Sequence, residues 1–207
     1  MVGCFIYIFT EIISKNQIQG VQSNISSALN PSGRIRKLED NLRFSNTFNN
    51  NIALADAYLY AGRTDEAIEI YERSLTGAFS ENEHVSTKLI NAYYIKERYN
   101  DVVTIVSKVY RQLKFSRSRE HMLYALALDK IGNTEKAENE FKMMNGNFSY
   151  YEPRYEYGLF LERIGRIDDS IMIFEEIIEE ERHLSSAERR DNRKWFSLAK
   201  EKLRATV

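Results

Sequence analysis

The chain has 207 residues, a length that suits one ordinary domain or one elongated array of repeats. Hydrophobic residues make up 43% and charged residues 29%, which is typical of a folded globular protein and excludes wholesale disorder. The 29 Lys and Arg against 30 Asp and Glu leave none of the basic excess of nucleic-acid binders. A single cysteine excludes a disulfide framework. Two prolines and nine glycines favour helices over a turn-rich β design.

The charge is unevenly distributed along the chain. Residues 1–46 carry a net charge of +2, residues 47–181 carry −8 and residues 182–207 carry +5. An acidic middle between basic ends is compatible with a basic ligand or with an anionic membrane surface. A solvated surface with a basic last helix is the simpler interpretation.

The N-terminal run, residues 1–13, is apolar apart from Thr10 and Glu11. As a helix it would extend about 20 Å, against roughly 30 Å for a bilayer core, so it cannot span a membrane alone. No basic region precedes it and no small-residue cleavage site comes after it, which disfavours a secretory signal. Residues 14–33, rich in Ser and Asn, are predicted to be a polar linker. Residues 34–46 then place Ile35, Leu38 and Leu42 on one face and predict an N-terminal capping helix.

Four segments that align with one another come next, and each contains a short turn between two apolar stretches. The turn segments end 35, 35 and 33 positions apart, and they are Gly62–Ala67, Glu97–Val102, Gly132–Ala137 and Gly165–Ser170. The apolar spacings on either side have a 3.6-residue period, which predicts a helix before and after each turn. Three turns offer a glycine for the left-handed conformation that ends many helices. Thr64 and Thr134 are expected to cap the second helices. Glu97 replaces the glycine of the second turn, which is therefore expected to be the least regular.

Residues 51–75 resemble a tetratricopeptide repeat that lacks the family's early tryptophan. The resemblance extends more loosely over roughly residues 47–181. It implies an all-α fold, a right-handed α-α superhelix of about four helix pairs within residues 47–186, with a concave inner face. Because one pair cannot bury its apolar stripe, neighbouring units must stack. Residues 187–207 are predicted to form the C-terminal capping helix, docked through Trp195.

A second resemblance concerns the N-terminal run. Residues 3–13 look like the end of the membrane segment that precedes phospholipase D/cardiolipin-synthase-type domains, as carried by some bacterial tetratricopeptide proteins. This resemblance implies that Met1 is an internal methionine of a longer, membrane-attached chain, here truncated. The basic residues behind the run, Lys15, Arg34, Arg36 and Lys37, suit the cytoplasmic side, on the inner face of the membrane. The alternative is an amphipathic or aggregation-prone leader without a membrane role.

No catalytic or metal-binding constellation is evident. His84, His121 and His183 are 37 and 62 positions apart, outside any metal-ligand spacing. No glycine pattern of a phosphate loop occurs. The sequence therefore predicts a protein that is not an enzyme, holds no metal or cofactor and binds no nucleic acid.

The remaining candidate is the concave face, which the first helix of each pair would build in the resembled family. Aligning the units gives three columns of inward-facing candidates for partner binding, and these are Ile52/Thr87/Met122/Tyr155, Asp56/Asn91/Leu126/Leu159 and Leu59/Tyr94/Asp129/Glu162. Aromatic, Met, amide and acidic groups together suit an adaptable peptide-binding groove, although each of these residues could instead pack between helices. The hypothesis is a cytoplasmic, membrane-tethered adaptor that binds a protein or peptide partner. The alternative is a soluble, self-associating structural protein with residues 1–13 in an oligomer contact.

Overall fold

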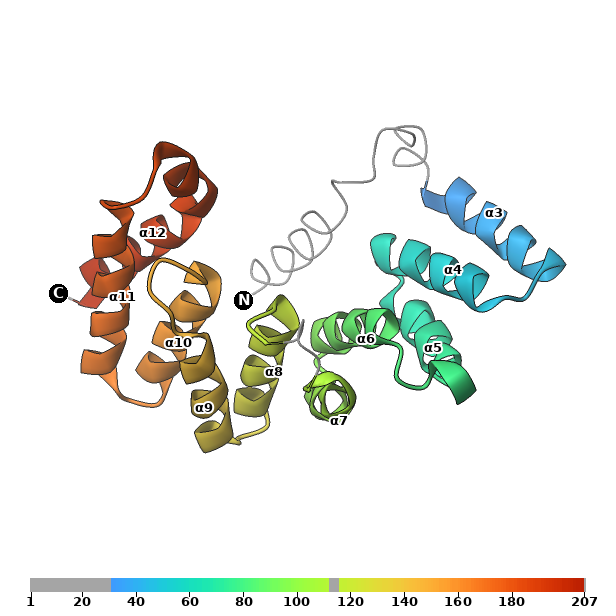
Figure 1. Ribbon diagram of the computed structural model, residues 1–207, viewed down its shortest axis with the longest axis horizontal. Coiled ribbons are helices and arrows are strands. Elements are labelled where there is room, and N and C mark those ends of the chain that lie inside the picture. Colours follow the sequence, from blue (N-terminus) through green and yellow to red (C-terminus); the bar gives the residue numbers. More distant parts are fainter. Residues whose placement is uncertain (1–30, 112–115, 207) are drawn as a thin grey trace. The chain divides into compact units, whose positions relative to one another are not determined.

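The computed structural model describes residues 31–111 and 116–206 and contains ten α-helices in those ranges (Figure 1). The helices form two compact units that divide between Phe115 and Ser116. Unit 1 contains α3 (Pro31–Phe44), α4 (Phe48–Tyr60), α5 (Thr64–Ser74), the short 3-10 helix η2 (Gly77–Phe79), α6 (Glu83–Ile95) and α7 (Tyr99–Val109). Unit 2 contains α8 (Arg119–Lys130), α9 (Thr134–Met144), α10 (Tyr151–Arg163), α11 (Ile167–Glu181) and α12 (Ser186–Thr206). The predicted all-α class of sequential antiparallel pairs is confirmed.

Side-chain caps start three of the first helices in their pairs. Thr47 accepts a hydrogen bond from the backbone N–H of Asn50 at α4, and Asn82 accepts one from Val85 at α6. Ser118 does the same at α8. Each cap satisfies one of the backbone donors that a helix start leaves without a partner.

The turn inside each pair uses one left-handed residue. Gly62, Gly132 and Gly165 have φ values of 77°, 82° and 83°, and Glu97 has a φ of 57°. At all four turns the residue after the left-handed one donates its backbone N–H to a carbonyl of the first helix. Arg98 donates to Tyr93 in this way, just as Arg63 donates to Tyr58. The expectation that the second turn is the least regular is therefore wrong. Glu97 adopts the same conformation at the steric cost that a Cβ carries there.

The expected caps Thr64 and Thr134 lie one position further along than predicted. Both are the first residues of their helices, while Arg63 and Asn133 are the N-cap residues and make no side-chain capping bond. The turn fixes this position, because its last hydrogen bond already holds the backbone of the residue after glycine. At the first turn the Arg63 side chain instead donates from Nε to Glu66 at 2.8 Å.

The helices pack through small residues on their facing sides. Ala67 and Ala137 are completely buried, so each second helix lies close to its first. Gly158 serves the α10–α11 pair in the same way, since a Cβ there would lie 2.5 Å from the ring of Phe174. At the C-terminal end α12 packs on α10 and α11, and Trp195 lies against Tyr155 with ring centroids 5.9 Å apart.

The first helix, α3, packs on α4 and includes residues 31–33, which the sequence assigned to the linker. The reason is Pro31, whose fixed φ and missing N–H suit the first turn of a helix. The predicted apolar segment 1–13 lies outside the described residues. Within the described part of the chain, every helix is too short or too polar to cross a bilayer.

Candidate functional site

Each unit has its own candidate surface, formed by the first helices of its pairs: α4 and α6 in unit 1, and α8 and α10 with the adjacent α12 in unit 2. Ion pairs show that these helices are neighbours within each unit. Lys88 of α6 lies 3.7 Å from Asp56 of α4, and Arg119 of α8 lies 3.0 Å from Glu152 of α10. We call these surfaces the first-helix face of unit 1 and the first-helix face of unit 2.

The twelve predicted partner-binding residues divide into two groups. Five are buried between helices, and they are Ile52, Leu59, Asn91, Met122 and Tyr155. Seven are half-buried at the first-helix faces, and they are Asp56, Thr87, Tyr94, Leu126, Asp129, Leu159 and Glu162. The buried members support the helices, and the half-buried members are the ones that remain partly exposed to solvent.

On the first-helix face of unit 1, the polar groups are held by their neighbours. Asp56 accepts a hydrogen bond from the hydroxyl of Tyr71, and burial together with this carboxylate raises the pKa of Tyr71. The amide of Asn91 donates to the carbonyl of Thr87 at 2.9 Å. The ring of Tyr94 meets Tyr99 edge-on, with centroids 5.6 Å apart. These contacts fix the positions of the side chains along the face.

On the first-helix face of unit 2, ion pairs join each helix to the next. Arg119 pairs with Glu152, and Asp129 pairs with Arg163, so α8 is tied to α10 near both ends. Burial raises the pKa of Asp129, and the Arg163 guanidinium opposes that rise. Lys202 of α12 donates to Glu162 of α10 at 2.6 Å. Half-buried Leu126 and Leu159 lie along α8 and α10 between these pairs.

Glu156 is a member of this face that the sequence analysis missed. Burial raises its pKa to about 7, and the carboxylate of Glu152, one helical turn away, raises it as well. The cations Lys194, Arg119 and Lys130 oppose the rise. The signal in the sequence was the spacing of four between Glu152 and Glu156, which places two carboxylates on one helix face.

A repeated joint between successive pairs was also missed. The hydroxyl of Tyr93 on α6 donates to Glu72 of α5 at 2.8 Å, and Arg98 donates to the same carboxylate at 3.1 Å. Glu138 of α9 accepts in the same way from Tyr157 of α10 and from Arg166. These joints hold one pair on the next.

The Arg-x-x-Asp/Glu pattern of the turns is the signal that could have found these joints. It occurs at Arg63, Arg98 and Arg166, each paired with the acid three positions on. The joints are structural, because their polar groups form hydrogen bonds and ion pairs with one another. They also lie at the junctions of helices rather than along the first-helix faces.

The histidines do not form a site. His121 is buried, its Nε2 lies 2.7 Å from Glu140, and its Nδ1 accepts the backbone N–H of Arg117 at 3.0 Å. His183 lies beside Glu179 and the ring of Phe148. Across residues 31–111 and 116–206, no group of three or more His, Cys, Asp or Glu could hold a metal ion.

A shallow cleft of about 360 Å³ lies elsewhere in unit 1, between α3 and the α4–α5 turn. Its charged lining is largely engaged, because Glu39 accepts from Tyr58 at 2.6 Å and Arg63 pairs with Glu66. It lacks the half-buried leucines that the first-helix face of unit 2 presents.

The first-helix faces and the left-handed turns between paired helices are features of a helix-repeat protein. The sequence model of the tetratricopeptide repeat family matches residues 49–76, which contain most of α4 and all of α5. A comparison with curated protein sequences finds no match.

Solved structures of MamA share the fold. MamA AMB-1 has a TM-score of 0.62 at 22% identity, covering 76% of this chain and 94% of that chain. MamA from Desulfovibrio magneticus RS-1, residue 41 to the end, has a TM-score of 0.66 at 15% identity. The match covers 89% of this chain and 97% of that chain. At these identities the likeness shows the fold alone. The resemblance of residues 3–13 to a phospholipase D-type membrane segment finds no support in these comparisons.

Proposed function

We propose that this protein is a non-catalytic adaptor that holds a segment of a partner protein against its first-helix faces. The observation that carries the proposal is the set of half-buried apolar and aromatic residues on these faces: Tyr94 in unit 1, and in unit 2 Leu126 and Leu159, which lie between helix-to-helix ion pairs. Rigid ion-paired helices with apolar side chains between them suit a peptide ligand, because little ordering is needed on binding.

The same arrangement makes catalysis a poor fit. The charged groups on the faces are mostly paired with each other, and the buried His121–Glu140 pair lies between α8 and α9, away from the half-buried residues. A nucleophile activated by an adjacent base is lacking among the residues that the structure describes, so covalent catalysis has no candidate residue in that part of the chain.

The test is site-specific photo-crosslinking in living cells of the native organism. A benzophenone amino acid replaces Leu159 on the first-helix face of unit 2 or, as the matched control, the exposed Met172 of α11. We expect a discrete crosslinked partner from position 159 and none of the same mass from position 172. Equal crosslinking from both positions, or none from 159 and a partner from 172, would contradict the proposal.

We also propose that residues 1–13 tether the protein to the cytoplasmic face of a membrane. The support is the apolar composition of this run and the basic residues behind it, Lys15, Arg34 and Arg36. Retention of the natural protein in alkaline-washed membranes, lost when residues 1–13 are deleted, is the expected result. Recovery of both forms in the wash would reject the tether and leave the adaptor proposal standing.

A further inference from the structure

The first-helix face of unit 2 leaves one carboxyl without a direct partner. Glu156 lies on α10 between Glu152 and the half-buried Leu159, and it is itself half-buried. No other residue in the described part of the chain donates a hydrogen bond to Glu156 or forms an ion pair with it. Carboxyl groups withdrawn from water ordinarily have such a partner.

Charged groups on three helices act on this carboxyl, and contacts of their own hold two of the cations. On α10 the nearest is Glu152, which like Glu156 is acidic. On α8 they are Arg119, whose guanidinium is taken by Glu152 at 3.0 Å, and the exposed Lys130. On α12 it is Lys194, whose ammonium lies over the Trp195 ring, 4.1 Å from its centroid.

Half-buried apolar side chains lie on the same three helices. Leu126 and Leu159 are half-buried on α8 and α10. Leu198 is half-buried on α12, one turn from Lys194, and therefore on the side of that helix that faces Glu156. A side chain that reaches Glu156 must cross this apolar surface, which suits the long aliphatic stem of a lysine or arginine.

We propose that the first-helix face of unit 2 binds a partner segment that carries one lysine or arginine between apolar residues, with its cationic group paired to Glu156. This inference rests on the proposed adaptor function and names the chemistry of the partner. A cation is the complement because the other carboxylates of the face are already neutralised, Glu152 by Arg119, Asp129 by Arg163 and Glu162 by Lys202.

The pairing has a proton signature. The pKa of Glu156 is about 7 in the unbound chain, so about half of the molecules carry the proton at pH 7. A bound ammonium or guanidinium favours the ionised carboxylate and expels that proton. Binding at pH 7 therefore releases about half a proton, and the affinity falls about fivefold from pH 7 to pH 6 as protonated Glu156 must first ionise.

The experiment begins with a random twelve-residue peptide display library selected on the full chain and, in parallel, on Glu156→Gln, which keeps the side-chain shape. Selections on the wild-type chain are expected to enrich one Lys or Arg next to apolar residues, and selections on Glu156→Gln are expected to lose that enrichment. Binders without a basic residue, or with enriched Asp and Glu, overturn the cation proposal while the adaptor function stands. If the library yields no peptide whose binding depends on Leu159, the adaptor function itself is overturned.

Calorimetry on the best selected peptide provides the second readout, in two buffers of different ionisation enthalpy at pH 7. Wild-type binding is expected to release about half a proton, and the Glu156→Gln complex none. The variant should bind at least about tenfold more weakly, the usual scale for a charge-assisted hydrogen bond. Glu175→Gln, an exposed change of the same charge on α11, is the control and should match the wild type. Equal affinity and equal proton release for Glu156→Gln overturn the proposal.

Discussion

Replacing Glu156 by Gln should make unit 2 more stable, and the gain should grow with pH. The folded chain holds this carboxyl at a pKa of about 7, against an ordinary value of 4.5. The cause is burial first and the neighbouring Glu152 second. The folded state therefore binds the proton more tightly than the unfolded state does, and ionising Glu156 costs stability.

The magnitude comes from the two pKa values. Below pH 4.5 both states are protonated, so the cost is absent; above pH 7 both are ionised, so the cost is complete. Each pKa unit corresponds to about 1.4 kcal/mol, which gives a full cost of about 3 kcal/mol. The stability difference between Glu156→Gln and the wild type should therefore rise by roughly 2–3 kcal/mol from pH 5 to pH 8.

The assay is urea unfolding monitored by fluorescence at pH 5, 6, 7 and 8. Trp195 is the single tryptophan of the chain and is buried in unit 2, so its emission reports the unit that holds Glu156. Glu175→Gln on the exposed side of α11 controls for the change in net charge. A difference between Glu156→Gln and the wild type that varies by less than about 0.5 kcal/mol across this pH range would refute the reasoning.

Three further substitutions test the packing. Glu97→Gly should stabilise unit 1 by about 1 kcal/mol in urea unfolding followed by circular dichroism, because it removes a Cβ from a left-handed position; a destabilised variant contradicts this. Gly158→Ala should cost about 1–3 kcal/mol in the same assay through its clash with Phe174, and an unchanged midpoint would reject the close packing of α10 on α11. Arg154→Ala should cost about 3–5 kcal/mol, since it leaves buried Glu180 without its cation; a loss below about 1 kcal/mol speaks against a desolvated pair.

The sequence could predict the helix pairs because each turn has a local signal. Gly62, Gly132 and Gly165 mark left-handed positions and the apolar triplets before them mark the buried side. Glu97 shows the limit of that rule, since the backbone path is set by the packing of α6 on α7 and overrides the preference of one residue.

The candidate site was predicted only in part. Helical spacing identifies the side of a helix that faces inward, but it cannot tell Met122, which is buried, from Leu126, which a partner can reach. That difference depends on how deeply neighbouring helices cover each position, which is a property of packing.

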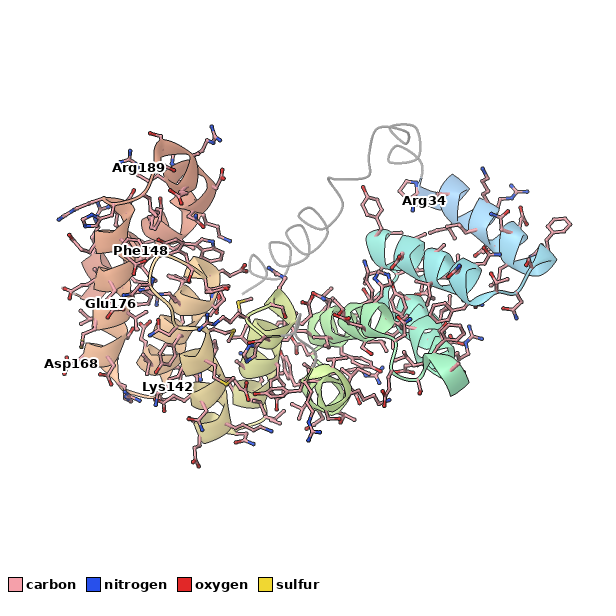
Figure 2. All side chains as sticks on the ribbon, in the orientation of Figure 1. Arg34, Lys142, Phe148, Asp168, Glu176 and Arg189 are labelled. Carbon is pink, nitrogen blue, oxygen red and sulfur yellow. The ribbon has the colours of Figure 1, made fainter. Side chains whose placement is uncertain are left out.

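Charge pairs between residues far apart in the sequence could not be predicted from local patterns either. Arg154 forms a buried pair with Glu180, 26 positions away, and also binds Glu176, which Figure 2 labels on α11. In the same place the backbone N–H of Phe148 donates to Glu180 at 2.8 Å and anchors the α9–α10 loop. The acidic run of α11 is therefore partly structural and not only a solvated face.

The most direct test of the adaptor account is the dissociation constant of the selected or crosslinked partner segment for Leu159→Glu and Met172→Glu. Both variants add the same charge to unit 2, the first on its first-helix face and the second at an exposed position on α11. With both folds verified by circular dichroism, Leu159→Glu should weaken binding at least about tenfold and Met172→Glu less than about twofold. Equal losses for the two variants, or a larger loss for Met172→Glu, would contradict binding at the first-helix face.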